Sequence, residues 1–368
     1  MSTHTVTLMP IGDVAKFLKS LIPANIPKEY ALKPVFESVA SDEKIRDGVI
    51  AFRDFLYLLF DRLVAEGSLY AKPPNKPGSM TDYPFLHRLT NLLVEIGYHG
   101  KLTDGGDSLL VTDIPLSNSF IDEKGKKKSP KISASGLVEV LRFLSLCGFV
   151  FTDTDLEDKK IAVSDSQPLK ATYPRNPALL TGLKALSIAD MELRAERRYW
   201  NDCYLLRCDY RLLRADSSDI FDELEDFLRP LPEEVQEFAK TLHKRYTEKG
   251  LTCFAMMRVD NNYFYVKVAG GKKELSLQDK YQKRLFAFSN TVRFGYSLFV
   301  RSKKTEKYKD TIAAFAPSLQ KKIAIGYGCY RQLGRTRCTG DCQGIRLPLD
   351  KTILDISDDI IKWLDCEV

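Results

Sequence analysis

Apolar residues recur every three or four positions over long stretches of the first half of the chain. The clearest stretch runs from Asp42 to Glu66, where Ser41 precedes an acidic first turn and Gly67 follows the last turn. Such spacing places one apolar stripe along a helix. The stripe consists of Ile45, Val49, Phe52, Leu56, Leu59 and Leu63. The pattern therefore predicts a helix over 42–66 that buries this stripe in a core.

Two later stripes have the same phase, and a glycine follows each of them directly. The first comprises Leu89, Leu92, Leu93 and Ile96 before Gly97, and the second comprises Val140, Phe143, Leu144 and Cys147 before Gly148. They predict helices over 84–96 and 136–147 that end at these glycines. After each glycine come an apolar segment, a polar turn and a second apolar segment, within 97–113 and 148–165. We therefore expect two helices, each followed by a β-hairpin.

This repeated order of helix and hairpin, over residues 80–170, resembles a tandem of winged-helix units. The resemblance implies that each helix enters a DNA groove and that each hairpin forms a wing. It also implies a short helix and a turn before each groove-binding helix. In this chain the proline-rich stretch 72–79 and the lysine-rich stretch 124–131 occupy those positions, which departs from the winged-helix plan.

The remaining residues are predicted to mix helices and strands. Helical spacing returns after Asn176, segment 203–213 fits either a strand or a continued helix, and 233–249 reads as a helix closed by Gly250. A hairpin is expected within 251–269 and a further strand at 295–302, with helices over 307–323 and 357–365. The expected fold class is α+β: a mainly helical N-terminal half with two helix–hairpin units, then a C-terminal α+β domain with an antiparallel sheet.

The length of 368 residues predicts two or three domains, because one hydrophobic core rarely serves so long a chain. We expect a helical domain with the first helix–hairpin unit at 1–116. The second unit and further helices follow at 117–215. An α+β domain with a cysteine-rich loop is expected at 216–368, after a boundary in the polar segment 215–219.

The composition is that of a globular protein, with 44% hydrophobic and 28% charged residues, and it indicates neither disorder nor a fibre. No apolar run approaches the roughly 20 residues of a membrane span, so no membrane partner is expected. No secretory signal is visible at the start, and eight cysteines are too few for a disulfide scaffold. These features predict a cytoplasmic protein. A net charge of +6 permits a nucleic-acid partner without requiring one.

A run of lysines between the two helix–hairpin units is a candidate nucleic-acid contact. It comprises Lys124, Lys126, Lys127, Lys128 and Lys131. Lysines so clustered attract phosphates and make binding salt-dependent. The alternative is a solvated loop without a partner. Most such runs are solvated loops, but two expected wings beside this run add weight to DNA as a partner.

The segment 326–344 concentrates cysteine, arginine and glycine. Cys329, Cys338 and Cys342 could hold a structural zinc if Cys253 or Cys366 supplied a fourth thiolate. The alternative is ordinary loop thiols. The same segment offers an anion site through its glycine amides and Arg331, Arg335 and Arg337, although no nucleotide-binding motif is present.

The combined pattern predicts a binding protein and leaves several functions open. No catalytic motif is recognisable, which favours a binding protein over an enzyme and leaves enzyme activity open. The first hypothesis is a DNA-linked regulator whose N-terminal half contacts nucleic acid or a partner while the C-terminal domain senses an effector. One alternative is an enzyme or small-molecule-binding protein with its pocket in the aromatic C-terminal domain. The other is a protein–protein interaction module.

Overall fold

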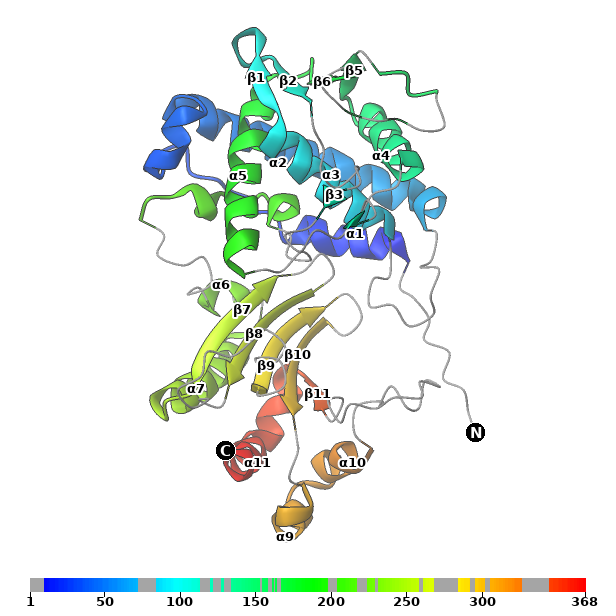
Figure 1. The fold of residues 1–368 in the computed structure, drawn as a ribbon. Coiled ribbons are helices and arrows are strands. Elements are labelled where there is room, and N and C mark those ends of the chain that lie inside the picture. The colour runs from blue at the N-terminus through cyan, green and yellow to red at the C-terminus, as the bar shows by residue number, and fades with distance from the viewer. Residues whose placement is uncertain are drawn as a thin grey trace. The chain divides into compact units, whose positions relative to one another are not determined.

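The computed structural model describes residues 10–71, 84–112, 120–121, 127–128, 134–152, 154–157, 161, 163, 167–197, 204–216, 224–228, 231–257, 261–267, 284–291, 295–301, 305–325 and 344–368. Their contacts divide the chain into two compact units (Figure 1). The part from Met9 to Ile220 is called the N-terminal unit. The part formed by Phe221–Met257 and Asn261–Val368 is called the C-terminal unit. The predicted boundary between residues 116 and 117 lies outside the described residues.

Helices make up most of the described N-terminal unit. They are α1 (Ile11–Ser20), α2 (Asp42–Glu66), α3 (Pro84–His99), α4 (Ala134–Leu146) and α5 (Ala178–Arg197). The prediction for 42–66 is confirmed in its bounds, and the whole predicted stripe is buried. Helix α2 crosses α5 at Gly48 and Gly182, where a Cβ on Gly182 would lie 2.1 Å from the Gly48 carbonyl oxygen. The two glycines therefore let the helix backbones approach each other directly.

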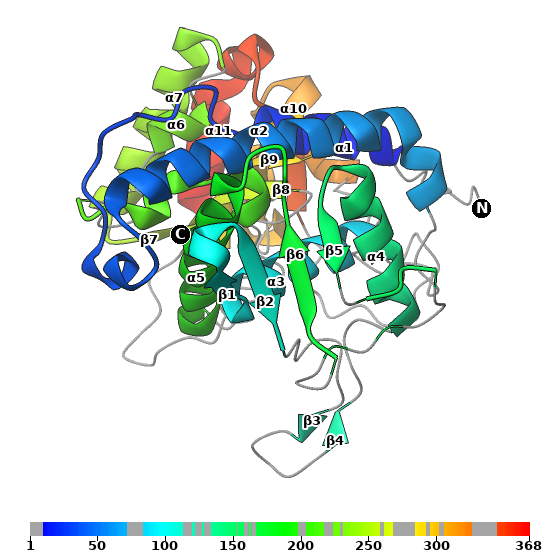
Figure 2. The same ribbon diagram turned by 90° about the horizontal axis from the view of Figure 1, so that it is seen from above.

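A four-stranded antiparallel sheet joins the two helix–hairpin units. Its strands run in the order β1 (Lys101–Thr103), β2 (Ser108–Val111), β6 (Leu169–Thr172) and β5 (Val150–Thr152), side by side in Figure 2. The first predicted hairpin is confirmed, because β1 pairs with β2 around the short turn η3 (Asp104–Gly106). Strands β2 and β6 pair directly, so both units share one sheet.

The second predicted hairpin is wrong in its return strand. Strand β5 pairs with β6, with Phe151 opposite Ala171, so the return strand begins at Leu169 and lies beyond the expected limit of 165. The described residues Ile161 and Val163 lie in no strand, although both are buried. The alternation of LKAT places Leu169 and Ala171 on the buried face. Ala171 lies opposite Leu109 and Phe151, and Leu169 lies opposite Val111, so burial of these residues favours this register.

The expected end of the first helix at Gly97 is also wrong. Helix α3 continues to His99, and Gly97 is buried where α3 meets α5. A Cβ on Gly97 would lie 2.2 Å from the Ser187 hydroxyl oxygen. This glycine is therefore needed for helix packing, whereas Gly148, after α4, has the positive φ of 104° typical of a helix end.

Short helical turns complete the N-terminal unit. They are η1 (Pro34–Ser38), η2 (Gly67–Tyr70), η4 (Leu205–Arg207) and η5 (Tyr210–Leu213). Segment 203–213 was expected to be a strand or a continued helix, but its described part forms η4 and η5. The left-handed conformation of Cys208, with φ of 49°, separates the two turns and prevents a continuous helix.

The C-terminal unit contains a five-stranded antiparallel sheet. Its order is β11 (Gly344–Pro348), β10 (Gly295–Arg301), β9 (Arg284–Thr291), β8 (Asn261–Lys267) and β7 (Thr252–Met257). The predicted β7–β8 hairpin and the β10 strand are confirmed, whereas β9 and β11 were not expected. Its helices include α6 (Leu224–Leu228), α7 (Glu233–Glu248) and α11 (Ser357–Glu367). With the helical N-terminal half, this sheet confirms the α+β class.

The single helix expected over 307–323 is interrupted. The chain forms η6 (Thr305–Tyr308), α9 (Lys309–Ala313) and α10 (Pro317–Ile325). Pro317 lacks an amide hydrogen and clashes with a preceding turn, so it begins a new helix instead of continuing the old one. The chain turns at residues 314–316 between the two helices. Phe315 in this turn and Leu319 in α10 are both buried.

Aromatic side chains contribute to the core of the C-terminal unit. Phe286 and Phe288 on β9 are fully buried, and Phe286 makes an edge contact with Tyr246 of α7. The fully buried Trp363 lies on α11. These rings therefore fill a core, as aromatic residues on strands commonly do.

Candidate functional site

Part of the predicted lysine site lies within the described backbone. Lys127 and Lys128 form the short strand β4 (Lys127–Lys128), which pairs with β3 (Phe120–Ile121). Lys124, Lys126 and Lys131 lie outside the described residues. Their role in nucleic-acid binding therefore stays a prediction.

The predicted zinc and anion sites lie almost wholly outside the described residues. This holds for Cys329, Cys338 and Cys342, and equally for Arg331, Arg335 and Arg337. Only the backbone of Cys253 is described, in β7 opposite Val266. In the described part of the chain, no group of three or more histidine, cysteine, aspartate or glutamate side chains could hold a metal ion.

The helices that correspond to the expected DNA-reading helices present little basic surface. Helix α3 is mostly buried, and Tyr98 is its one exposed residue. The described residues of α4 expose Arg142 and Leu146, and Arg142 donates to the Leu156 carbonyl oxygen at 2.6 Å. A groove-binding helix needs an exposed polar face, which α3 lacks because it lies between neighbouring elements.

Charges in the N-terminal unit balance. Residues 9–220 contain 29 lysines and arginines and 29 aspartates and glutamates. Many of the described cations lie in ion pairs, including Lys19–Asp61 at 2.5 Å and Arg88–Glu139 at 2.5 Å. A neutral unit with paired charges gives no long-range attraction for a polyanion.

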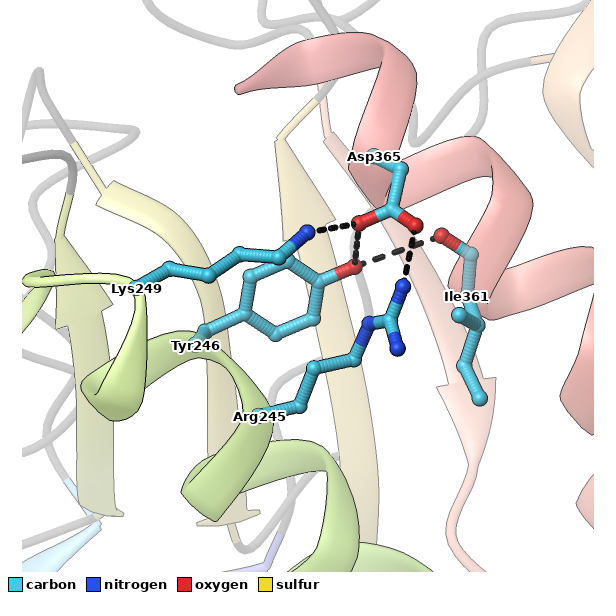
Figure 3. Close-up of polar contacts among 5 residues, drawn as sticks. All are labelled: Arg245, Tyr246, Lys249, Ile361 and Asp365. Atoms are coloured by element: carbon cyan, nitrogen blue, oxygen red, sulfur yellow. Dashed lines mark hydrogen bonds and ion pairs between the residues drawn. The ribbon is translucent and has the colours of Figure 1, made fainter.

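A three-donor cluster connects α7 and α11 in the C-terminal unit (Figure 3). The Asp365 carboxylate accepts from Arg245 at 2.6 Å, from Lys249 at 2.7 Å and from the Tyr246 hydroxyl at 3.0 Å. The Tyr246 hydroxyl also lies 3.2 Å from the Ile361 carbonyl oxygen. Because three protein donors already surround the carboxylate, this cluster is a structural clamp between two helices.

The clamp changes the ionisation of both acids in it. Partial burial by itself would raise the pKa of Asp365, but hydrogen bonds from Lys249, Arg245 and Tyr246 outweigh burial and lower that pKa. Burial is the main cause that raises the pKa of the Tyr246 hydroxyl, and the hydrogen bond and negative charge of Asp365 raise this pKa further. The aspartate is therefore ionised and the tyrosine neutral at pH 7.

We expect Asp365→Asn to lower the free energy of unfolding by about 1 kcal/mol at pH 7, since it weakens partly exposed charge-assisted hydrogen bonds. A lowered folded pKa stabilises the fold above the ordinary aspartate pKa of about 3.9. That stabilisation is lost as the pH falls through the folded pKa. Urea unfolding at pH 7 and pH 3 should show the gap between wild type and variant narrowing. Asp355→Asn, at an exposed carboxylate with no ion pair among the described residues, is the control. Equal midpoints for wild type and Asp365→Asn at pH 7 would contradict this role.

Positive charge in the chain is concentrated in one segment of the C-terminal unit. Residues 261–346 contain 18 lysines and arginines against 5 aspartates and glutamates, a net charge of +13. The flanking segments 221–257 and 347–368, which contain α6, α7 and α11, have net charges of −3 and −4. The C-terminal unit therefore joins an acidic helical part to a strongly basic segment.

Four lysines on the basic segment are exposed and have no ion pair among the described residues. They are Lys307, Lys309, Lys321 and Lys322, named here the α9–α10 lysines. None of them forms a salt bridge within the described part of the chain. Their charges are therefore available to an anionic partner.

The segment from η6 to α10, which carries these lysines, is hydrogen-bonded to α11. The Tyr308 hydroxyl donates to the Glu367 carboxylate and accepts from the Trp363 indole at 3.1 Å. The Ala316 amide donates to the Asp359 carboxylate at 2.7 Å. Figure 1 shows α9 and α10 beside α11 within this unit. The lysines thus project from an anchored support.

The sequence-based predictions did not include the α9–α10 lysines. Lys307 and Lys309 lie in the lysine-rich stretch 303–309, KKTEKYK, and Lys321 and Lys322 are adjacent, but neither stretch was singled out as a site. The available signal was the net charge of each domain, because charge asymmetry between parts of a chain is informative where total charge is not.

Comparison with known proteins gives no match for this chain, whether to a family model, to a curated protein or to a solved structure. Within the described residues, no helix combines the length and apolar character that crossing a bilayer requires. The evidence for the candidate site therefore consists of the charge and exposure of its residues.

Proposed function

We propose that this protein binds nucleic acid and that the C-terminal unit supplies the cationic contact. The observation that carries the proposal is the separation of charge: a net +13 in residues 261–346 beside a neutral N-terminal unit. A concentrated positive segment attracts a phosphodiester backbone and releases its condensed counterions. The helix–hairpin pattern of the N-terminal unit is compatible with this class of protein.

The proposal assigns the two units differently from the sequence-based hypothesis. There, the N-terminal helices contact DNA and the C-terminal domain senses an effector. Here, we assign the N-terminal unit the role of a scaffold or partner-binding part, because α3 is buried, the net charge of residues 9–220 is zero and many of the described cations are ion-paired. The basic C-terminal segment makes the phosphate contacts.

The proposal predicts salt-dependent binding to duplex DNA. In fluorescence anisotropy with a mixed-sequence duplex of about 25 base pairs, we expect the logarithm of the association constant to fall linearly with the logarithm of salt concentration. Four phosphate contacts correspond to a slope of roughly −3 to −4. An uncharged peptide nucleic acid duplex is the control and should not bind. No binding at low salt, or an affinity unchanged by salt, would refute the proposal.

A further inference from the structure

We infer that the α9–α10 lysines form the phosphate-contacting surface of this protein and that their ligand is duplex DNA. The inference rests on the proposed function and assigns it to particular residues. Its first support is availability, since all four lysines are exposed and free of ion pairs within the described residues. By contrast, Lys244 on α7 lies 3.9 Å from Glu248 and Lys351 lies 3.2 Å from Glu234.

Anchoring of the support is the second argument. Lysines on a mobile loop lose conformational entropy when they bind, whereas lysines on an ordered helix lose less. The α9–α10 turn is fixed by the Ala316–Asp359 hydrogen bond and by the Gln320 amide, which donates to the Phe315 carbonyl oxygen at 2.6 Å. Buried Phe315 and Leu319 attach the turn to the core. The charges are therefore presented in a preorganised arrangement.

Among the described residues 307–322 no aromatic ring is exposed, which favours a duplex over a single-stranded ligand. Within 307–322 the aromatic residues are Tyr308 and Phe315, and both are buried. Proteins that hold single strands stack the bases on exposed aromatic side chains. A surface of lysines with small neighbours instead suits a duplex, whose bases are covered and whose phosphates are dense. We therefore assign the surface to the duplex backbone, without base readout.

The test compares two double variants that remove the same charge from one unit. Lys321→Ala/Lys322→Ala should weaken duplex binding roughly tenfold at 100 mM salt and reduce the magnitude of the salt slope by about 2. Lys244→Ala/Lys351→Ala, which removes ion-paired lysines, should leave both values near those of wild type. Lys321→Arg/Lys322→Arg should retain binding because the charge is kept. Lys307→Gln/Lys309→Gln provides a second pair if the alanine variant folds poorly by circular dichroism.

The outcomes separate the inference from the proposed function. If wild type binds duplex DNA and both lysine-pair variants bind as tightly, the assignment to this surface is overturned while the proposed function stands. An equal loss in the Lys244→Ala/Lys351→Ala variant also overturns it. Tighter binding to single-stranded DNA, or to duplex RNA, overturns the choice of ligand. If wild type binds no nucleic acid, both fail together.

Discussion

Gly182→Ala is expected to lower the free energy of unfolding of the N-terminal unit by about 3 kcal/mol, at the upper end of the usual cost of overpacking. The new Cβ would lie 2.1 Å from the Gly48 carbonyl oxygen and 2.6 Å from the Val49 amide nitrogen. Both atoms belong to the backbone of α2, so no side-chain rotation can relieve the clash. The helices must separate, and this opens the core between them.

The equivalent substitution in α2, Gly48→Ala, should also lower the free energy of unfolding. A Cβ on Gly48 would lie 2.5 Å from the Gly182 amide nitrogen. Gly12→Ala in α1 is the matched control, because its Cβ would meet the Val64 carbonyl oxygen at 3.4 Å, an ordinary contact. Alanine favours a helix over glycine by up to about 1 kcal/mol, so this control should be neutral or stabilising.

Urea unfolding followed by far-ultraviolet circular dichroism measures the difference. A Gly182→Ala variant with a midpoint equal to that of Gly12→Ala would show that α2 and α5 do not touch at these positions. The expected order of stability is Gly12→Ala at or above wild type, with Gly182→Ala and Gly48→Ala well below it.

Arg211→Met is expected to lower the free energy of unfolding by about 3 kcal/mol, because it removes a cation from a buried pair. The Arg211 guanidinium donates to both oxygens of Asp209, at 2.8 and 3.1 Å. The Asp209 side chain is only 2% exposed, so water cannot replace the lost donors. In Arg211→Met the buried Asp209 carboxylate therefore loses the two hydrogen bonds and the positive charge that offset its burial.

The titration of Asp209 provides a second measurement. Burial alone would raise its pKa, but the charge and hydrogen bonds of Arg211, together with Arg207, outweigh burial and lower it. The ionised pair therefore stabilises the fold above the ordinary aspartate pKa of about 3.9, and this contribution is lost as the pH falls through the lowered folded pKa. The stability gap between wild type and Arg211→Met should therefore narrow as the pH is lowered below about 3.9.

A double-mutant cycle distinguishes the loss of the ion pair from the loss of packing. Asp209→Leu/Arg211→Met removes the carboxylate as well and should be more stable than Arg211→Met alone. If the double variant is instead the less stable of the two, the packing of the arginine stem, and not the charge of Asp209, explains the effect.

Local patterns were sufficient for α2 and for the β1–β2 and β7–β8 hairpins. Apolar spacing identified α2 to the residue, and the alternation on either side of the expected turn at 260–262 identified β7 and β8, although β8 already begins at Asn261. These elements depend on neighbours a few positions apart in the chain, which the sequence displays directly. The same reasoning missed β11, whose partner β10 is distant in the chain, and it missed β9 although β10 follows β9 directly.

The amino-acid pattern was ambiguous wherever a residue had two possible physical roles. Gly97 has the position of a helix end, but contact with Ser187 makes it a packing residue inside α3. Strand β6 was placed too early, because the segment after residue 158 is also apolar and only pairing with β2 selects Leu169–Thr172. In both cases a contact with a distant element selects between local alternatives.

The candidate site shows the same division. The net charge of residues 261–346 follows from the sequence alone, because this segment contains 18 lysines and arginines against 5 aspartates and glutamates. Which of those cations are exposed, unpaired and anchored depends on folding, because an ion pair joins side chains that can be far apart in the sequence. Lys351 pairs with Glu234 over 117 positions, whereas Lys321 and Lys322 have no such partner among the described residues. Composition and spacing thus determined the class of fold and the sign of the charge, and long-range packing determined where that charge is available.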